Sequence, residues 1–151
     1  MKKKPNAPVP PATRIQEAAV APSVDWETDE GFGGIQEIRE GLPVDAFFEL
    51  QEKLGVGTPR LAEIVGIPVR TLQRRKDDGR LTKEESDRLD RVRKLMGQAT
   101  GIFESEIAAR AWLTHPQIGL AGFVPLDLAD TGAGIREVEK LLGRIDYGVY
   151  A

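Results

Sequence analysis

Residues 58–76 limit the choice of fold more than any other part of the sequence, because their pattern predicts two short helices joined by a tight turn. Thr58 suits the N-cap position, and Pro59 suits the first helical position, where a missing N–H costs no hydrogen bond. Apolar residues then recur at helical spacing and predict one buried face, made of Leu61, Ile64 and Val65. Gly66 follows this face and favours a left-handed C-terminal cap. The first helix should therefore end at this glycine.

The second half of the stretch predicts another helix, with Pro68 at its start. Val69 and Leu72 would anchor this helix, and its polar residues would lie largely outside. Ala62 and Gly66 are four residues apart, with apolar residues around them at the spacing of a helix-turn-helix. In that motif the second helix enters the major groove of DNA.

The polar side chains of the second helix have the chemistry for this contact. Arg and Gln present forked groups that match the edges of guanine and adenine, and further Arg or Thr groups can bind phosphates. The predicted DNA-binding residues are Arg70, Thr71, Gln73, Arg74 and Arg75. A helical hairpin with a basic, solvated face is the alternative interpretation of the same pattern.

The distribution of charge agrees with contact to nucleic acid. The 151-residue chain has a net charge of −3, but residues 58–98 contain 11 Lys and Arg against 7 Asp and Glu. The segments on either side are acidic. Because phosphate contact depends on the local field, a mildly acidic total does not exclude DNA as a partner.

Composition argues against a catalytic or metal site. Cysteine is absent, which excludes disulfides and thiol nucleophiles and fits a reducing cytosol. His115 is the only histidine, and one imidazole lacks the converging partners that a site requires. No apolar run is long enough to span a bilayer. We therefore expect no catalytic residues, no metal, no cofactor and no membrane partner, with a cytoplasmic location and association with the nucleoid when the chain is bound to DNA.

The whole chain predicts an all-α protein in three parts. Residues 1–34 are rich in Pro, Ala and charge and predict a flexible arm. Residues 35–103 predict the helix-turn-helix and its supporting helices, with Pro43 opening the helix before the motif. Residues 104–151 predict a smaller helical half, in which residues 117–125 form a packed loop and Ile135, Val138, Leu141 and Leu142 form the buried side of the last helix.

The longest predicted helix follows the motif and begins with a capping box formed by Thr82 and Glu85. Its apolar stripe permits two interpretations, burial inside one chain or pairing with a second copy. The stripe comprises Leu89, Val92, Leu95, Met96, Ala99, Ile102 and Phe103. The charged residues expected to face water are Lys83, Asp87, Arg88, Arg91 and Lys94.

The C-terminal end of the sequence carries two aromatic residues, Tyr147 and Tyr150, on either side of Gly148 and Val149. Tyrosine is enriched where one protein docks on another. An end too short to build its own core could insert into a partner or fold back on the last helix. The sequence favours neither of these two alternatives.

Several motifs together resemble one protein family. The C-terminal ones are Ala111–Pro116, Leu120–Leu128 and Gly134–Ala151, and the earlier ones are Leu72–Arg75, Leu81 and Glu85–Leu89. They are similar to the C-terminal domain and the helix-turn-helix of Xre/MbcA/ParS-type antitoxins. The resemblance covers residues 35–151. Ala121 departs from the family, which usually has a second glycine there.

The resemblance implies an antitoxin that binds a RES-domain toxin that consumes NAD⁺. The C-terminal domain would cover the toxin's cleft, with the implied contacts Arg144, Tyr147, Gly148, Val149, Tyr150 and Ala151. The helix-turn-helix would bind operator double-stranded DNA as a homodimer and repress its own operon. A dimeric repressor with no toxin partner is the alternative, and an enzyme is the weakest of the three hypotheses.

Overall fold

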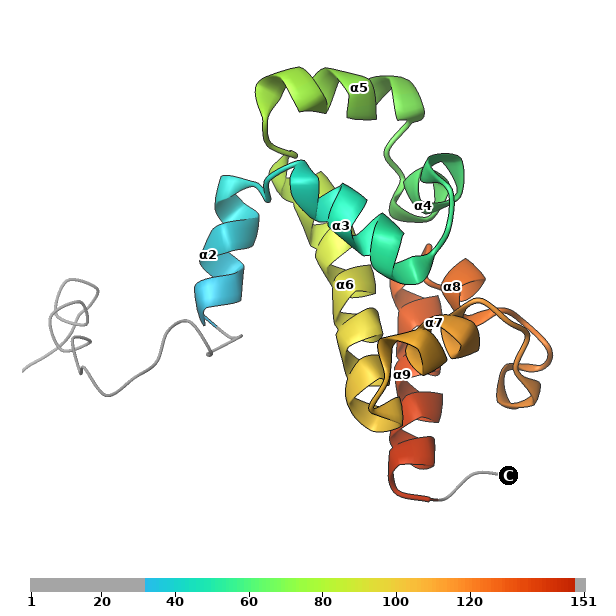
Figure 1. Cartoon of the computed structure of the whole chain (residues 1–151). Helices are drawn as coiled ribbons and strands as arrows, with labels where there is room; N and C mark the ends of the chain where they lie inside the picture. Colours follow the sequence, from blue (N-terminus) through green and yellow to red (C-terminus); the bar gives the residue numbers. More distant parts are fainter. Residues whose placement is uncertain (1–31, 149–151) are drawn as a thin grey trace, which may run out of the picture. The chain divides into compact units, whose positions relative to one another are not determined.

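The structure is a computed structural model that describes residues 32–148. Most of the predicted arm and three predicted toxin contacts, Val149, Tyr150 and Ala151, lie outside the described residues. The described elements are helices, in the order α2 (Phe32–Glu40), α3 (Asp45–Leu54), α4 (Thr58–Val65), α5 (Val69–Asp78), α6 (Lys83–Phe103), α7 (Glu106–Leu113), the 3₁₀ helix η1 (Ile118–Leu120), α8 (Pro125–Leu128) and α9 (Gly132–Asp146) (Figure 1). The predicted all-α fold is confirmed.

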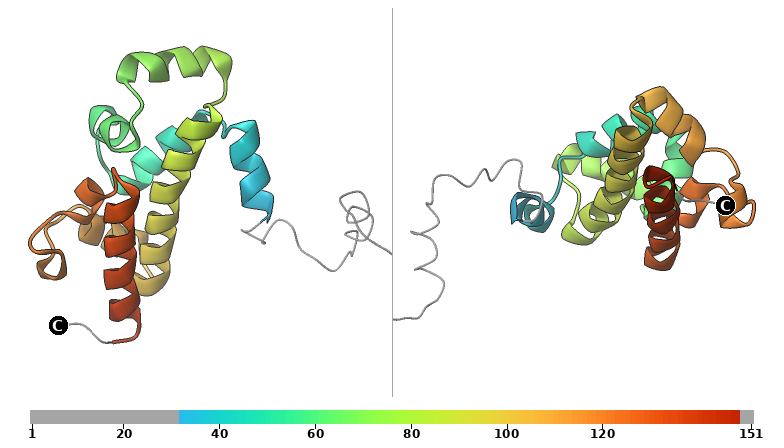
Figure 2. Two further views of the ribbon diagram at one scale, coloured as in Figure 1. Left: turned by 180° about the vertical axis from the view of Figure 1, so that it is seen from behind. Right: turned by 90° about the horizontal axis from the view of Figure 1, so that it is seen from below.

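The chain divides into two units, with the boundary between Glu37 and Ile38. The second unit contains α3 to α9 and is organised around α6, a helix of 21 residues. Helix α6 contacts α3 and α4, which precede it in the sequence, and α7 and α9, which follow it. Both views of Figure 2 show α6 and α9 side by side. One hydrophobic core therefore extends through the whole described unit from α3 to α9.

Most of the apolar stripe of α6 is buried inside the chain, and its last two residues, Ile102 and Phe103, are partly buried against the core. Leu89, Val92, Leu95, Met96 and Ala99 are all buried in the core. The capping box is also confirmed, because the Thr82 hydroxyl accepts a hydrogen bond from the Glu85 N–H and the Glu85 carboxylate accepts one from the Thr82 N–H. Burial within one chain accounts for the stripe.

The start of α4 differs from the prediction. Thr58 is the first helical residue and Gly57 the N-cap, so the Thr58 hydroxyl caps nothing. It instead donates a 2.9 Å hydrogen bond to Gln51 Oε1 at the end of α3. The other end agrees with the prediction, because Gly66 has a left-handed φ of 69°.

Pro43 does not open the helix before the motif, because α3 begins at Asp45. Pro43 forms an isolated antiparallel bridge with Arg80, next to hydrogen bonds from Leu81 N to the Leu42 carbonyl and from Val44 N to the Gly79 carbonyl. The flanking Leu42 and Val44 are both buried, and Val44 already has helical backbone angles as the N-cap of α3. The bridge fastens the end of α5 to the start of α3.

Two helices of the C-terminal half begin at residues whose side chains cap them. Ser105 caps α7 and Thr131 caps α9, each accepting a hydrogen bond from a backbone N–H three residues on. All four predicted residues of the buried face of α9 are buried. Gly134 is required, because a Cβ at this position would overlap the Leu128 carbonyl oxygen. No helix within residues 32–148 is long and apolar enough to cross a membrane.

Candidate DNA-binding helix and candidate partner surface

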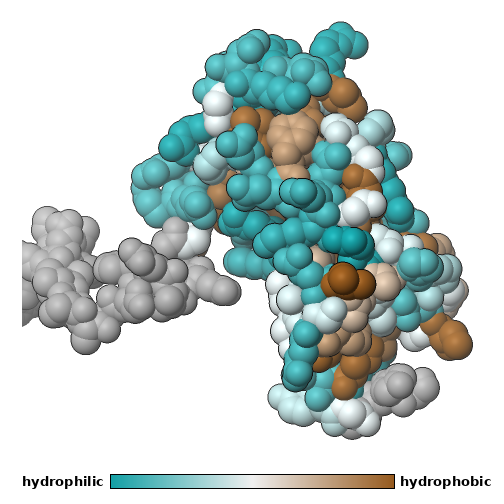
Figure 3. Space-filling view, in the orientation of Figure 1, coloured by the Kyte–Doolittle hydropathy of each residue, from teal (hydrophilic) through white to brown (hydrophobic). Residues whose placement is uncertain are grey.

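Helix α5 presents a polar, basic surface and is anchored by Leu72, which is completely buried. Among the predicted DNA-binding residues, Arg70, Gln73 and Arg74 are exposed and Thr71 is half-buried. Positions 70, 73 and 74 lie on one face of a helix, since residues three and four apart are neighbours. Figure 3 shows the hydrophilic cover over this end of the unit. Val69, expected as an anchor, is exposed at the start of the helix.

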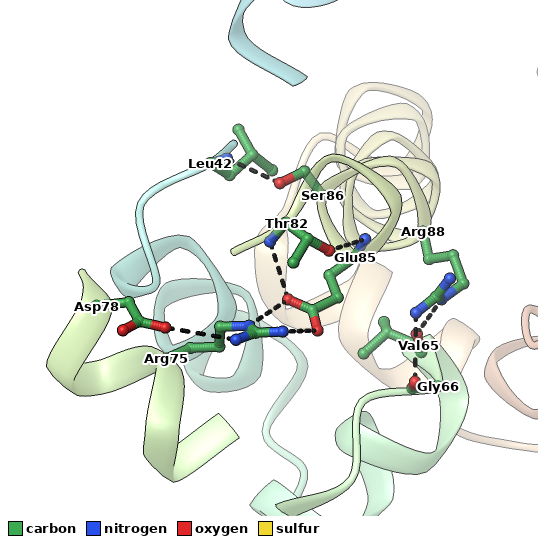
Figure 4. Close-up of polar contacts among 9 residues, drawn as sticks. All are labelled: Leu42, Val65, Gly66, Arg75, Asp78, Thr82, Glu85, Ser86 and Arg88. Carbon is green, nitrogen blue, oxygen red and sulfur yellow. Dashed lines mark hydrogen bonds and ion pairs between the residues drawn. The ribbon is translucent and has the colours of Figure 1, made fainter. Parts of the chain in front are cut away.

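Arg75 does not lie outside as predicted, since its side chain is only 16% exposed and that of Glu85 only 9%. Its Nε donates to Glu85 Oε1 over 2.8 Å and its Nη2 donates to Glu85 Oε2 over 3.0 Å. Nη1 also reaches Asp78 Oδ2 at 3.4 Å (Figure 4). This two-pronged pair joins α5 to the first turn of α6.

The pair shifts the pKa of both partners. The hydrogen bond to Glu85 raises the pKa of Arg75, so its guanidinium stays charged. Burial by itself would raise the pKa of Glu85, but hydrogen bonds from Arg75 and the Thr82 backbone outweigh it and leave this pKa below its ordinary value. The same carboxylate thus closes the capping box and holds α5.

Arg88 was expected to face water, and this prediction is wrong. Its Nε donates a 2.6 Å hydrogen bond to the Val65 carbonyl, and its Nη2 donates a 3.3 Å bond to the Gly66 carbonyl. These carbonyls end α4, where a cation is favoured by both hydrogen bonding and the helix dipole. Arg88 therefore fixes the turn between the two helices of the motif (Figure 4).

Ser86 completes the contacts from the first turns of α6. It is completely buried, and its hydroxyl accepts a 2.8 Å hydrogen bond from the Leu42 N–H. Glu85, Ser86 and Arg88 thus hold the end of α5, the segment before α3 and the turn after α4. Sequence reasoning missed all three roles, because the partners lie between 10 and 44 residues away along the chain.

The C-terminal half exposes large apolar side chains on a surface of different character. Ile107 on α7 is 72% exposed, Ile118 on η1 93%, Phe123 57% and Tyr147 84%. Arg144 and Gly148, two of the implied toxin contacts, are also exposed. Tyr147 therefore does not pack against its own helix. Figure 3 shows apolar residues over this half, away from the hydrophilic end.

Among residues 32–148, His115 and the carboxylates form no recognisable centre. The His115 Nδ1 lies 2.7 Å from the Ala111 carbonyl oxygen in the last turn of α7. Within the described part of the chain, no three His, Asp or Glu side chains gather as metal ligands would.

The α5 surface and the apolar surface of the C-terminal half each lie in a region that matches a known domain family. The family model described as the antitoxin Xre-like helix-turn-helix domain matches residues 33–94, and the antitoxin Xre/MbcA/ParS C-terminal toxin-binding domain matches residues 98–148. A protein named antitoxin Xre from Yersinia enterocolitica is 31% identical over 143 residues, covering 93% of this chain and 95% of the relative. The chain belongs to the Xre antitoxin family. The two matched regions meet within α6, the helix that both halves share.

Two further relatives carry the same name. An antitoxin Xre of Photorhabdus laumondii is 29% identical over 92% of this chain and 95% of its own length. One of Pseudomonas putida is 34% identical over 74% of this chain and 69% of its own length. Membership of the Xre antitoxin family confirms the predicted resemblance and makes this chain a regulator with a helix-turn-helix, not an enzyme.

Proposed function

We propose that this Xre-family chain neutralises a RES-domain toxin that degrades NAD⁺ and represses the operon that encodes both proteins. The observation that carries the proposal is one folded unit with two matched domains, in which α5 bears exposed Arg and Gln side chains and the opposite half exposes apolar ones. We divide the chain accordingly into an arm (1–34), a DNA-binding part (35–103) and a toxin-binding part (104–151).

In this proposal, α5 binds operator DNA through Arg70, Thr71, Gln73 and Arg74. Three of these side chains are exposed, and none of the four takes part in the Arg75–Glu85 pair. Arg75 acts as a positioning residue, because its guanidinium is already bound by Glu85. A single reading helix contacts few base pairs, so two copies on adjacent half-sites are expected.

The DNA assignment is tested by replacing Arg70 and Arg74 together with Ala. Operator binding in a gel-shift assay should weaken at least about tenfold and lose about one unit of salt dependence for each lost phosphate contact. The matched control removes two exposed charges from α9, as Arg136→Ala with Lys140→Ala, and should bind like the unmodified chain. Equal losses in both variants would show a general charge effect and reject α5 as the reading helix.

The toxin assignment places the chain end, Tyr147 to Ala151, and Arg144 at the mouth of the toxin's active site. The exposure of Tyr147 supports it, because an aromatic ring left in water gains by burial in a partner. A chain truncated after Asp146 should bind its operator normally but fail to stop NAD⁺ consumption by the product of the adjacent toxin gene. Full inhibition by the truncated chain would reject the assignment.

The alternative, a dimeric repressor with no toxin partner, predicts a different composition on purification. Isolated from its native host, such a repressor would carry no second protein in stoichiometric amount. The proposed antitoxin should instead elute with the toxin as a complex of defined mass.

A further inference from the structure

The turn between α7 and α8 is held in one shape by its own hydrogen bonds. Gln117 N donates to the Phe123 carbonyl over 3.1 Å, and Gly122 N donates to the Gln117 carbonyl over 2.9 Å. The Gln117 side chain also donates a 2.9 Å bond to the Trp112 carbonyl in α7. Residues 117–123 therefore form a closed turn fastened to the helix before it.

The same turn is seated on α9. Leu120 is buried, and Gly119 lies so close to Leu141 that a Cβ would come within 2.9 Å of both its δ carbons. A larger residue at this position would require the Leu141 side chain to move. At the tip, Ala121 has a left-handed φ of 56°, a conformation that costs energy in a residue with a Cβ and that persists only where the surroundings enforce it.

This rigid turn holds two large apolar side chains in solvent. Ile118 is 93% exposed, the highest value among the exposed large apolar side chains of the described residues, and Phe123 is 57% exposed. The packed loop expected from the sequence is thus buried only in part. Exposed apolar patches mark surfaces that bind other molecules, and these two side chains are carried by one short turn. A preformed turn also loses little conformational entropy on binding.

The chemistry of the turn identifies the kind of partner. Residues 117–125 contain no charged side chain, so they offer no charge to attract phosphate groups. The turn lies within residues 98–148, the region that matches a toxin-binding domain. It rests on Leu141 of α9, and Tyr147, the residue that caps the C-terminal end of this helix, follows six residues later.

We propose that Ile118 and Phe123 form a second anchor for the toxin, inserted into an apolar pocket beside the cleft that the chain end covers. This inference rests on the proposed toxin-binding function and adds to it a binding surface separate from Tyr147–Ala151. The turn would supply affinity and orientation, while the chain end would block the active site.

The test measures binding of the full chain to the purified product of the adjacent toxin gene by titration calorimetry. Ile118→Ser combined with Phe123→Ser should weaken binding by at least about 30-fold, the size expected for loss of an interface hot spot. Its melting temperature and operator affinity should stay unchanged, because both side chains lie largely outside the core. The matched control is Ile107→Ser, which alters a similarly exposed aliphatic side chain on α7.

Three results would overturn the inference. The first is toxin affinity of the double variant within threefold of the unmodified chain, and the second is an equal loss in the Ile107→Ser control. The third is loss of self-association with toxin affinity intact, which would assign the turn to a second copy of this chain. Failure of the unmodified chain to bind the toxin is distinguishable from all three and would reject the proposed function together with this inference.

Discussion

Replacement of Glu85 by Gln should loosen α5 while leaving the cap of α6 in place. The Glu85 carboxylate accepts two hydrogen bonds from Arg75, at 2.8 and 3.0 Å, and one from the Thr82 N–H at 2.9 Å. A Gln side chain keeps one oxygen for the Thr82 N–H, as capping boxes allow. It loses the charge and turns an NH₂ group toward the guanidinium, so the change isolates the Arg75 contact.

The free energy of unfolding lost in Glu85→Gln should lie between the values for exposed and for buried ion pairs. Exposed pairs contribute up to about 1 kcal/mol, whereas breaking a buried pair costs about 3–5 kcal/mol. Both side chains here are largely buried, but Arg75 retains some contact with water and with Asp78. We expect Glu85→Gln to lower the free energy of unfolding by about 2 kcal/mol. For a unit of this size that corresponds to a fall in melting temperature of roughly 6–10 °C.

The dependence on pH gives a second signature. Because the folded-state pKa of Glu85 lies below its ordinary value of 4.5, its contribution is fully present above that value and is lost as the pH falls through the folded pKa. The unmodified chain should therefore lose its advantage over Glu85→Gln in acid. The two stability curves should approach each other as the pH falls below 4.5 and meet once it has passed through the lower folded-state pKa of Glu85.

The assay is urea unfolding, followed by circular dichroism, of a double-mutant cycle that combines Arg75→Ala with Glu85→Gln. A coupling energy of about 1.5–3 kcal/mol at neutral pH is expected. Arg75→Lys should recover only part of it, since Lys keeps the charge but lacks the fork. A coupling energy below about 0.5 kcal/mol would refute the reasoning, because it would show that the Arg75–Glu85 pair contributes no more than an exposed ion pair.

Three further substitutions test single contacts by thermal or urea unfolding. Arg88→Ala should cost about 1–2 kcal/mol, because two carbonyls at the end of α4 lose their donor; an unchanged midpoint would contradict this. Ala121→Gly should stabilise the chain by about 0.5–1 kcal/mol by relieving the left-handed φ, and a destabilised variant would oppose it. Gly134→Ala should cost about 3 kcal/mol or more, since its Cβ overlaps the Leu128 carbonyl; near-normal stability would reject the close approach of α8 and α9.

The features that could be predicted from the sequence depend on residues close together along the chain. The capping box of Thr82 and Glu85 and the left-handed Gly66 each involve partners within a few residues. The buried face of α9 follows from spacing alone. For these features, residues that are close in the sequence make the contact themselves, so the local pattern is enough to predict it.

The features that could not be predicted depend on contacts between distant residues. Arg74 and Arg75 are neighbours of identical type, and only the position of Glu85 on another helix decides that one faces solvent and the other is held. Arg88 occupies a solvent-facing position by helical spacing, yet it reaches a helix end 23 residues earlier. Ile118 belongs to an apolar run, but the 3₁₀ turn directs it outward. Neither the residue type nor the helical spacing of the apolar residues shows which distant residues will come into contact.

The shared helix α6 determines which experiments can separate the two functions. Its first turns hold the motif through Glu85, Ser86 and Arg88, and its later turns pack in the same core as α7 and α9. A compact unit of this size is expected to unfold cooperatively, so a buried substitution in either half lowers the folded population available to both partners. Loss of toxin binding after such a change is therefore no evidence for a contact. Changes at exposed residues can separate the two proposed activities: Arg70 with Arg74 for the proposed operator contact, and either Ile118 with Phe123 or the chain end from Tyr147 for the proposed toxin contact.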